Sequence, residues 1–173
     1  MDQPRREKLS VFCNVKPGDV ISAPDVDSIY KIPAVFEEQA FSDAILDKFG
    51  IKPKGANLDK WIAISEVQEK AKKTVKIGVV GKYFSTGDYT LSDSYISVIE
   101  ALKSAAWANK AAIELDWINS EDFEEDKAKL KTLSGYDGIL VPGGFGTRGI
   151  EGVISTVQYC RENKIPYFGI CYG

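Results

Sequence analysis

The chain has 173 residues, of which 44% are hydrophobic and 27% are charged. That much apolar surface excludes disorder as the main state, and a chain of this length can bury roughly 70% of its unfolded surface without metal or disulfide support. The 22 basic and 25 acidic side chains give a net charge of −3, which argues against nucleic acid and anionic membranes as partners, since both attract a cationic protein. No apolar run approaches the ~20 residues of a membrane span.

The first 50 residues predict an irregular segment. Residues 9–13 form a short apolar run typical of a buried strand. The stretch 15–33 is rich in proline and aspartate and predicts irregular strands and turns. Apolar spacing over 34–50 predicts two short helices, with Ser42 or Asp43 as a cap between them.

Residues 51–74 have the composition of a linker. They begin with proline and glycine and continue with a charged, polar stretch that contains few large apolar residues. We expect one helix here, with Asp59 as its N-cap, because lysines gather near its C-terminal end, where the helix dipole favours positive charge.

After Thr74 the pattern becomes a regular alternation of apolar strands and amphipathic helices. This order is typical of an α/β fold, a parallel sheet with helices on both faces. The predicted strands cover 75–81, 112–118, 136–144 and 165–173, and the predicted helices cover 92–110, 120–135 and 149–164.

Cysteine and histidine usage limits the chemistry of the chain. The sequence contains no histidine, so a Ser-His-Asp or Cys-His site cannot be completed within it. Its cysteines at 13, 160 and 171 have no metal-binding spacing and cannot all pair. We therefore expect reduced thiols, no metal site and a cytoplasmic protein.

The last predicted strand ends in a G-x-C-x-G motif, Gly169 to Gly173, with Cys171 at its centre. This is the thiol counterpart of the nucleophile elbow, in which a sharp strand-to-helix turn exposes a reactive side chain and needs glycines on both sides. The motif therefore makes Cys171 a candidate nucleophile. The alternative is an ordinary buried cysteine beside two turn glycines.

A glycine-rich segment, residues 142–149, follows the third predicted strand. Its spacing matches neither a phosphate-binding P-loop nor a dinucleotide motif, so its backbone N–H groups are better suited to an oxyanion hole. Parallel strands place Gly144 and Cys171 at the same edge of the sheet. The alternative is a flexible loop without a ligand.

Two basic residues flank this predicted edge. Lys82 ends the first predicted strand and either contacts a substrate or effector or belongs to an exposed loop. Arg148 either pairs with an anion or is solvated with its loop.

Several motifs, in the same order along the chain, resemble the CTP synthase family. They match the end of its synthetase domain, its interdomain linker and the first part of its class I glutamine amidotransferase domain. These motifs are Phe12–Val15, Ile21–Tyr30, Ala56–Leu58 with Trp61, Val80–Tyr83, Ser94–Leu102, Val141–Gly152 and Ile165–Gly173.

The resemblance implies three parts: residues 1–50 from the synthetase domain, the linker 51–74, and residues 75–173 from the N-terminal part of the glutamine amidotransferase domain. The whole enzyme is expected to convert UTP to CTP with ATP, Mg²⁺ and ammonia from glutamine, and to form a homotetramer. It implies a nucleophilic role for Cys171. It further implies glutamine-site roles for Gly144, Tyr172 and Gly173.

The resemblance also suggests nucleotide contacts. Asp25 and Val26 match positions near the ATP adenine, although Pro24 stands where some members have lysine. Phe145 and Arg148 match the rim that meets the activator GTP.

The resemblance further implies that the UTP site, the Mg²⁺ ligands and the phosphate-binding loop lie upstream, and that the histidine and glutamate of the triad lie downstream. The isolated chain is then expected to be inactive and to expose an apolar sheet edge. Two alternatives remain. One is another class I amidotransferase or a γ-glutamyl hydrolase, against which the segment 22–30 and the linker argue. The other is a non-catalytic assembly module.

Overall fold

The computed structural model describes residues 1–55, 57–82, 85–86, 89–90 and 95–173. They form two compact units, Met1–Glu66 and Val67–Gly173. The division between the units falls inside helix α4, Asp59–Lys70. None of the helices in these described ranges has the length and apolarity that crossing a bilayer requires.

The first unit begins with helix α1, Gln3–Cys13, so the strand predicted over 9–13 is wrong. The helix is capped at both ends. The side chain of Asp2 accepts a hydrogen bond from the Arg5 N–H (3.0 Å), and Asn14 ends the helix in the left-handed conformation. A short apolar run is compatible with either a helix or a strand, and the hydrogen bonds of these two caps stabilise the helix.

The stretch after α1 is irregular, as predicted, and holds two single 3₁₀ turns, η1 (Pro17–Asp19) and η2 (Ile29–Lys31). Its extended part is attached to the helices by Gln39. The side-chain amide of Gln39 accepts from the Ser22 N–H and donates to the Ser22 carbonyl, both at 2.8 Å. One glutamine thus pairs with the backbone as a neighbouring strand would.

The two short helices predicted over 34–50 are present as α2, Ile32–Glu37, and α3, Phe41–Lys48. The predicted cap between them is wrong, because left-handed Ala40 precedes α3 and Ser42 and Asp43 lie inside it. In the linker, Asp59 is the first residue of α4, and the Asn57 side chain accepts its N–H at 3.0 Å.

The second unit contains a four-stranded parallel sheet with the order β4-β1-β5-β6, which confirms the predicted α/β fold. The strands are β1 (Thr74–Gly81), β4 (Ala112–Asn119), β5 (Gly138–Val141) and β6 (Tyr167–Gly169). Two residue pairs, β2 (Ser85–Thr86) and β3 (Tyr89–Thr90), form a small antiparallel ladder after β1.

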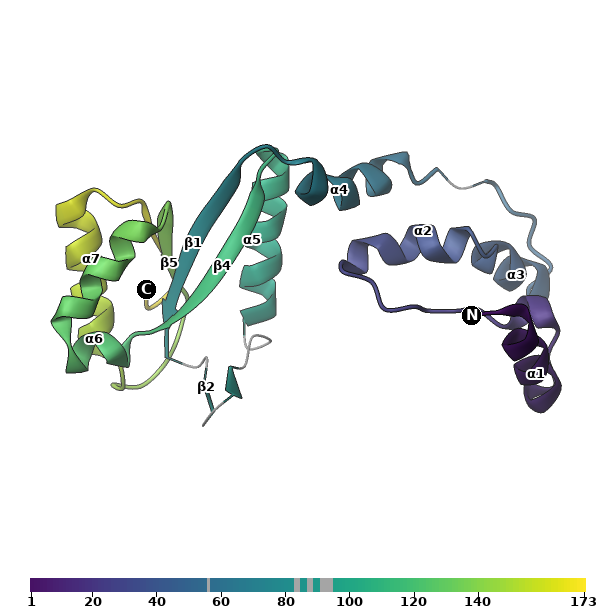
Figure 1. Ribbon diagram of the computed structural model, residues 1–173, viewed down its shortest axis with the longest axis horizontal. Helices are drawn as coiled ribbons and strands as arrows, with labels where there is room; N and C mark the ends of the chain where they lie inside the picture. Colours follow the sequence, from purple (N-terminus) through teal and green to yellow (C-terminus); the bar gives the residue numbers. More distant parts are fainter. Residues whose placement is uncertain (56, 83–84, 87–88, 91–94) are drawn as a thin grey trace. The chain divides into compact units, whose positions relative to one another are not determined.

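Helices cover both faces of this sheet (Figure 1). Helix α5, Ile96–Ala108, packs on one face, where Val79 and Leu140 are buried. The other face carries α6 (Glu121–Glu125), the 3₁₀ helix η4 (Lys127–Gly135) and α7 (Ile150–Asn163). The larger core lies on that face and includes Val80, Phe123, Leu130, Leu133, Ile139, Val141, Val153 and Cys160.

The single helix predicted over 120–135 is in fact two, because the chain becomes extended at Asp126. The Asp126 side chain accepts the Ala128 N–H at 2.8 Å and starts η4 as a new cap. Aspartate forms this local hydrogen bond readily, which favours a helix start over a helix interior. The first residues of the helix predicted over 92–110, positions 92–94, lie outside the described residues.

Candidate active site

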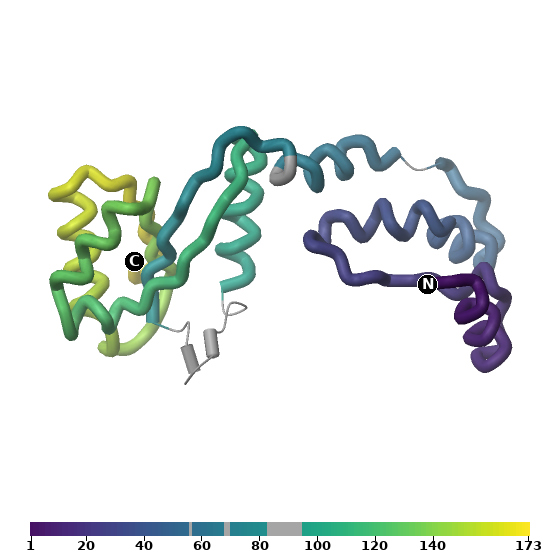
Figure 2. Tube along the Cα trace, viewed as in Figure 1, coloured from purple at the N-terminus to yellow at the C-terminus, as the bar shows by residue number. Residues whose placement is uncertain are grey.

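The chain turns sharply at Cys171, directly after β6. Cys171 has φ = 57°, a left-handed conformation that costs energy for a residue with a side chain. The Ile170 N–H donates to the Val141 carbonyl (2.9 Å), and the Gly173 N–H donates to the Ile170 carbonyl (3.0 Å). These bonds close the turn and bring the end of the chain back to β5 (Figure 2). The Cys171 side chain is exposed.

Glycine is required on both sides of this turn. A Cβ on Gly169 would overlap the carbonyl group of Gly173, and a Cβ on Gly173 would overlap the carbonyl oxygen of Val141. The turn is therefore closed so tightly that neither position has room for a side chain. This is the steric reason for the G-x-C-x-G pattern.

The glycine-rich loop, which we define as residues 142–149, lies beside Cys171. A Cβ built on Gly143 would lie 3.4 Å from the Cys171 Cβ and 4.0 Å from its Sγ. The Tyr95 hydroxyl donates to the Gly143 carbonyl (2.9 Å). The N–H groups of Gly143 and Gly144 donate to no other group in the described part of the chain. The fold thus places Gly143 beside Cys171, and the N–H groups of Gly143 and the adjacent Gly144 are available as donors.

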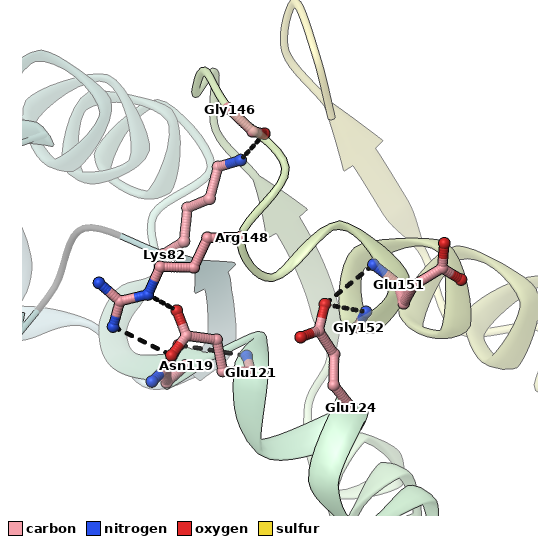
Figure 3. Close-up of polar contacts among 8 residues, drawn as sticks. All are labelled: Lys82, Asn119, Glu121, Glu124, Gly146, Arg148, Glu151 and Gly152. Carbon is pink, nitrogen blue, oxygen red and sulfur yellow. Dashed lines mark hydrogen bonds and ion pairs between the residues drawn. The ribbon is translucent and has the colours of Figure 1, made fainter.

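Lys82, at the end of β1, contacts both the glycine-rich loop and the Cys171 turn. Its ammonium group donates to the Gly146 carbonyl (2.7 Å) and lies 5.4 Å from the centre of the Tyr172 ring. The lysine therefore links the loop to the residue that follows Cys171. Figure 3 shows the bond from Lys82 to Gly146.

Arg148 pairs with an acidic side chain of the same unit. Its Nε and Nη2 both contact the Glu121 carboxylate, with Nη2 3.0 Å from Oε2 (Figure 3). This hydrogen bond and charge attraction raise the pKa of Arg148 above its ordinary value. Of the two alternatives for Arg148, the structure shows an ion pair, and the anion is Glu121.

Comparison with known proteins agrees with this geometry. Residues 90–173 match the class I glutamine amidotransferase family, and residues 1–51 match the CTP synthase N-terminus. A CTP synthase of Azospirillum brasilense is 47% identical over 169 residues, which are 97% of this chain and 30% of that protein. A CTP synthase of Ruminiclostridium cellulolyticum is 41% identical over 173 residues, all of this chain and 31% of that protein.

Over its whole length the chain is similar to part of these CTP synthases.

A solved structure agrees with this similarity and with the fold. The glutaminase domain of Trypanosoma brucei CTP synthase, with bound acivicin, matches at a TM-score of 0.51 and 38% identity. The match covers 57% of this chain and 37% of that one. The chain spans about three tenths of the length of the two curated CTP synthases.

The remaining predicted site residues lie in different places. Phe145 and Tyr172 are on the same edge as Cys171, with 85% and 52% of their surface exposed. Asp25 and Val26 belong to the first unit, in the extended stretch between η1 and η2, where Asp25 is exposed and Val26 half-buried. The structure therefore brings the Cys171 turn and the glycine-rich loop together. Asp25 and Val26, the residues predicted to lie near the ATP adenine, belong to the other unit.

The other two cysteines do not resemble Cys171. Cys160 is fully buried in α7, and burial raises the pKa of its thiol. Cys13 is exposed at the end of α1. No group of three or more possible metal ligands occurs within the described ranges.

Sequence reasoning missed four residues that support the loop: Gly143, Tyr95, Glu121 and Glu124. Gly143 stands next to the predicted Gly144, and the G-G pair itself did not indicate which glycine faces the thiol. Tyr95, at the start of α5, and Glu121, on α6, contact the loop itself, and Glu124, on α6, contacts the first turn of α7 directly after it. Their separation from the loop along the chain left no local signal.

Proposed function

We propose that the protein takes part in the ATP-dependent amination of UTP to CTP, and that its second unit releases the ammonia from glutamine at Cys171. One observation carries this proposal: an exposed thiol in a left-handed turn lies against Gly143 of a loop with available N–H groups. Acyl transfer from an amide needs a nucleophile and oxyanion donors in this relation.

In the proposed reaction the Cys171 thiolate attacks the side-chain amide carbon of glutamine. The amide oxygen becomes an oxyanion, which the N–H groups of Gly143 and Gly144 stabilise. The carbon–nitrogen bond then breaks, the nitrogen takes a proton and leaves as ammonia, and a glutamyl thioester remains on the sulfur. Water hydrolyses the thioester, which releases glutamate and restores the thiol.

Tyr172 and Gly173 follow the nucleophile and are proposed to line the glutamine site. The Gly173 carbonyl accepts a hydrogen bond from the Tyr167 hydroxyl (3.0 Å), which supports this role because it holds the segment beside β6. The chain has no histidine, so we propose that the base for the thiol is supplied by residues that this chain does not contain.

ATP is proposed to contact the first unit through Asp25 and Val26. An exposed carboxylate can accept from the adenine amino group, and a half-buried valine can pack on the ring. The described residues contain no cluster that fits Mg²⁺, and none of the proposed steps involves the metal.

Phe145 and Arg148 are proposed to meet GTP as the activator. The exposed Phe145 ring supports this, because a flat apolar side chain can stack on a base. Arg148 is engaged by Glu121, so a nucleotide phosphate would compete with that carboxylate for the guanidinium group.

At the level of the whole protein we propose a cytoplasmic homotetramer. In it, residues 1–50 belong to the synthetase domain, 51–74 form the linker and 75–173 belong to the glutamine amidotransferase domain. The matches at 1–51 and 90–173 support this division.

Acivicin, a glutamine-like electrophile, tests the proposed nucleophile. A thiolate displaces its chloride, so the carbon–sulfur bond that forms can be located by peptide mass spectrometry. We expect an adduct on Cys171 whose rate of formation falls when glutamine is added. Exposed Cys13 is an internal control and should show no protection by glutamine.

The proposal fails if Cys13 and Cys171 react at equal rates and glutamine protects neither. A second arm joins this chain to the histidine-containing remainder of a relative's glutaminase domain. Labelling of Cys171 should then be faster than in the chain alone, because a base is present. Equal rates in both would contradict the need for that base.

A further inference from the structure

The glycine-rich loop contains two glycines in the left-handed conformation. Gly146 and Gly149 have φ values of 81° and 72°, in the left-handed region that glycine enters freely. Gly149 is also the N-cap of α7 and provides no side-chain hydrogen bond. Contacts from other elements of the unit therefore help to fix the position of the loop.

The short helix α6 supplies contacts to Arg148 in the loop and to the first turn of α7, which directly follows the loop. Glu124 Oε1 accepts hydrogen bonds from the N–H groups of Glu151 (3.0 Å) and Gly152 (3.4 Å) in the first turn of α7 (Figure 3). Glu121, one turn earlier on α6, holds Arg148. We call Glu121 and Glu124 the α6 clamp.

Glu124 accepts hydrogen bonds from backbone N–H groups at the N-terminus of α7. The first four N–H groups of a helix have no partner within the helix. Here the Ile150 N–H donates to the Thr147 carbonyl (3.3 Å) and the Val153 N–H to the Gly149 carbonyl (3.1 Å). The two between them donate to Glu124, whose negative charge also suits the positive end of the helix dipole.

The backbone around the clamp is packed without spare room. A Cβ on Gly152 would overlap the Ser120 carbonyl oxygen, and a Cβ on Gly149 would overlap the Ser120 hydroxyl oxygen. Ser120 directly precedes α6 and is fully buried. The start of α6 and the start of α7 thus meet at backbone distance, and a shift of one would move the other.

We infer that Glu121 and Glu124 are positioning residues that set the glycine-rich loop against Cys171. They act on the loop's far end, while Tyr95 and Lys82 hold Gly143 and Gly146. Neither acid touches the reacting atoms. This role rests on the proposed function, because it matters for catalysis only if the N–H groups of the loop stabilise an oxyanion.

Hydrogen exchange of the backbone amides tests the clamp without any need for activity. Glu124→Ala should raise exchange at Glu151 and Gly152 about fivefold, the effect of losing one hydrogen bond of ordinary strength. Peptides from β1 and β4 should be unaffected. Glu124→Gln keeps the acceptor oxygen and should restore more than half of the protection. Glu125→Ala, an exposed neighbour on α6, is the matched control.

A second readout is the rate at which acivicin labels Cys171, which should fall in Glu124→Ala and Glu121→Gln and recover in Glu124→Gln. Glu124→Ala behaving as Glu125→Ala in both readouts would overturn the inference. So would a rise in exchange spread evenly over the whole sheet, which indicates general destabilisation. If glutamine-protected labelling is absent from the unaltered chain, the proposed function fails, while the exchange result still decides whether the clamp orders the loop.

Discussion

A Cβ on Gly169 would occupy the space of the Gly173 carbonyl group. The two glycines thus approach each other across Cys171 at backbone distance, and the turn that presents the thiol depends on both.

Gly169→Ala should open this turn. We expect glutamine-protected labelling of Cys171 to fall at least tenfold, and the free energy of unfolding to fall by about 1–3 kcal/mol, as for other overpacked sites. Labelling kinetics and urea unfolding measure the two effects. Gly135→Ala is the control, since nothing lies within 4 Å of a Cβ at that position. Unchanged labelling in Gly169→Ala would mean that the turn tolerates a side chain.

The left-handed backbone of Cys171 predicts an unusual order of stabilities. A Cβ in this conformation costs roughly 1–2 kcal/mol, so Cys171→Gly should be more stable than Cys171→Ala by about 1 kcal/mol. At Cys160, within helix α7, the order should be reversed, because glycine destabilises a helix by about 1 kcal/mol relative to alanine. Thermal unfolding of the four variants checks both orders, and the same order at both sites would show that the Cys171 turn is unstrained.

Strand β6 pairs with β5 alone among the described strands and carries an exposed apolar side chain. Phe168 is 64% exposed and borders a hollow of about 260 Å³ that Leu102 and Leu140 also line. An unpaired apolar edge of this kind favours association between chains. Phe168→Lys should therefore reduce self-association, measured by sedimentation at increasing protein concentration.

Ile154→Lys is the control for this edge, since Ile154 is 53% exposed and belongs to α7 rather than to β6. It should leave association unchanged. Equal effects of the two substitutions would assign the association to net charge.

The contacts of Asp116 predict how the free energy of unfolding depends on pH. It accepts a hydrogen bond from the Lys76 ammonium group and one from the Tyr136 hydroxyl, both at 3.0 Å. The bond from Lys76 holds the pKa of Asp116 below its ordinary value of 3.8. A lowered pKa in the folded state means that ionised Asp116 stabilises the fold above that value, and that this contribution is lost as the pH falls through the folded-state pKa.

Asp116→Asn should accordingly lower the free energy of unfolding at pH 7, and the difference from the unaltered chain should shrink below a pH of about 3.8. Urea unfolding at neutral and acidic pH measures this difference. The effect should be small, since both side chains of the ion pair are more than two fifths exposed. Glu125→Gln on the exposed face of α6 serves as the control. A difference that grows on acidification would contradict the assigned role.

Much of the fold could be predicted because its signals are local. Long apolar strands and amphipathic helices alternate after Thr74, and this order alone predicted the parallel sheet. The errors came at places where the local signal is ambiguous. The run 9–13 suits a helix as well as a strand, and Asp126 divides a helix whose apolar spacing continues past it.

The sequence by itself marked Cys171 as the centre of an elbow, because the G-x-C-x-G pattern lies within five consecutive residues. The group that excludes a Cβ at Gly173, the Val141 carbonyl oxygen, is brought there by the tertiary structure. The partners of the glycine-rich loop were decided by the tertiary structure alone. Lys82 and Gly146 are 64 positions apart, and Glu121 and Arg148 are 27 apart. They meet because the sheet places β1 between β4 and β5. Charge and hydrogen-bonding capacity are properties of single residues. An ion pair or a hydrogen bond between two distant residues forms only where the packing of the chain brings them together.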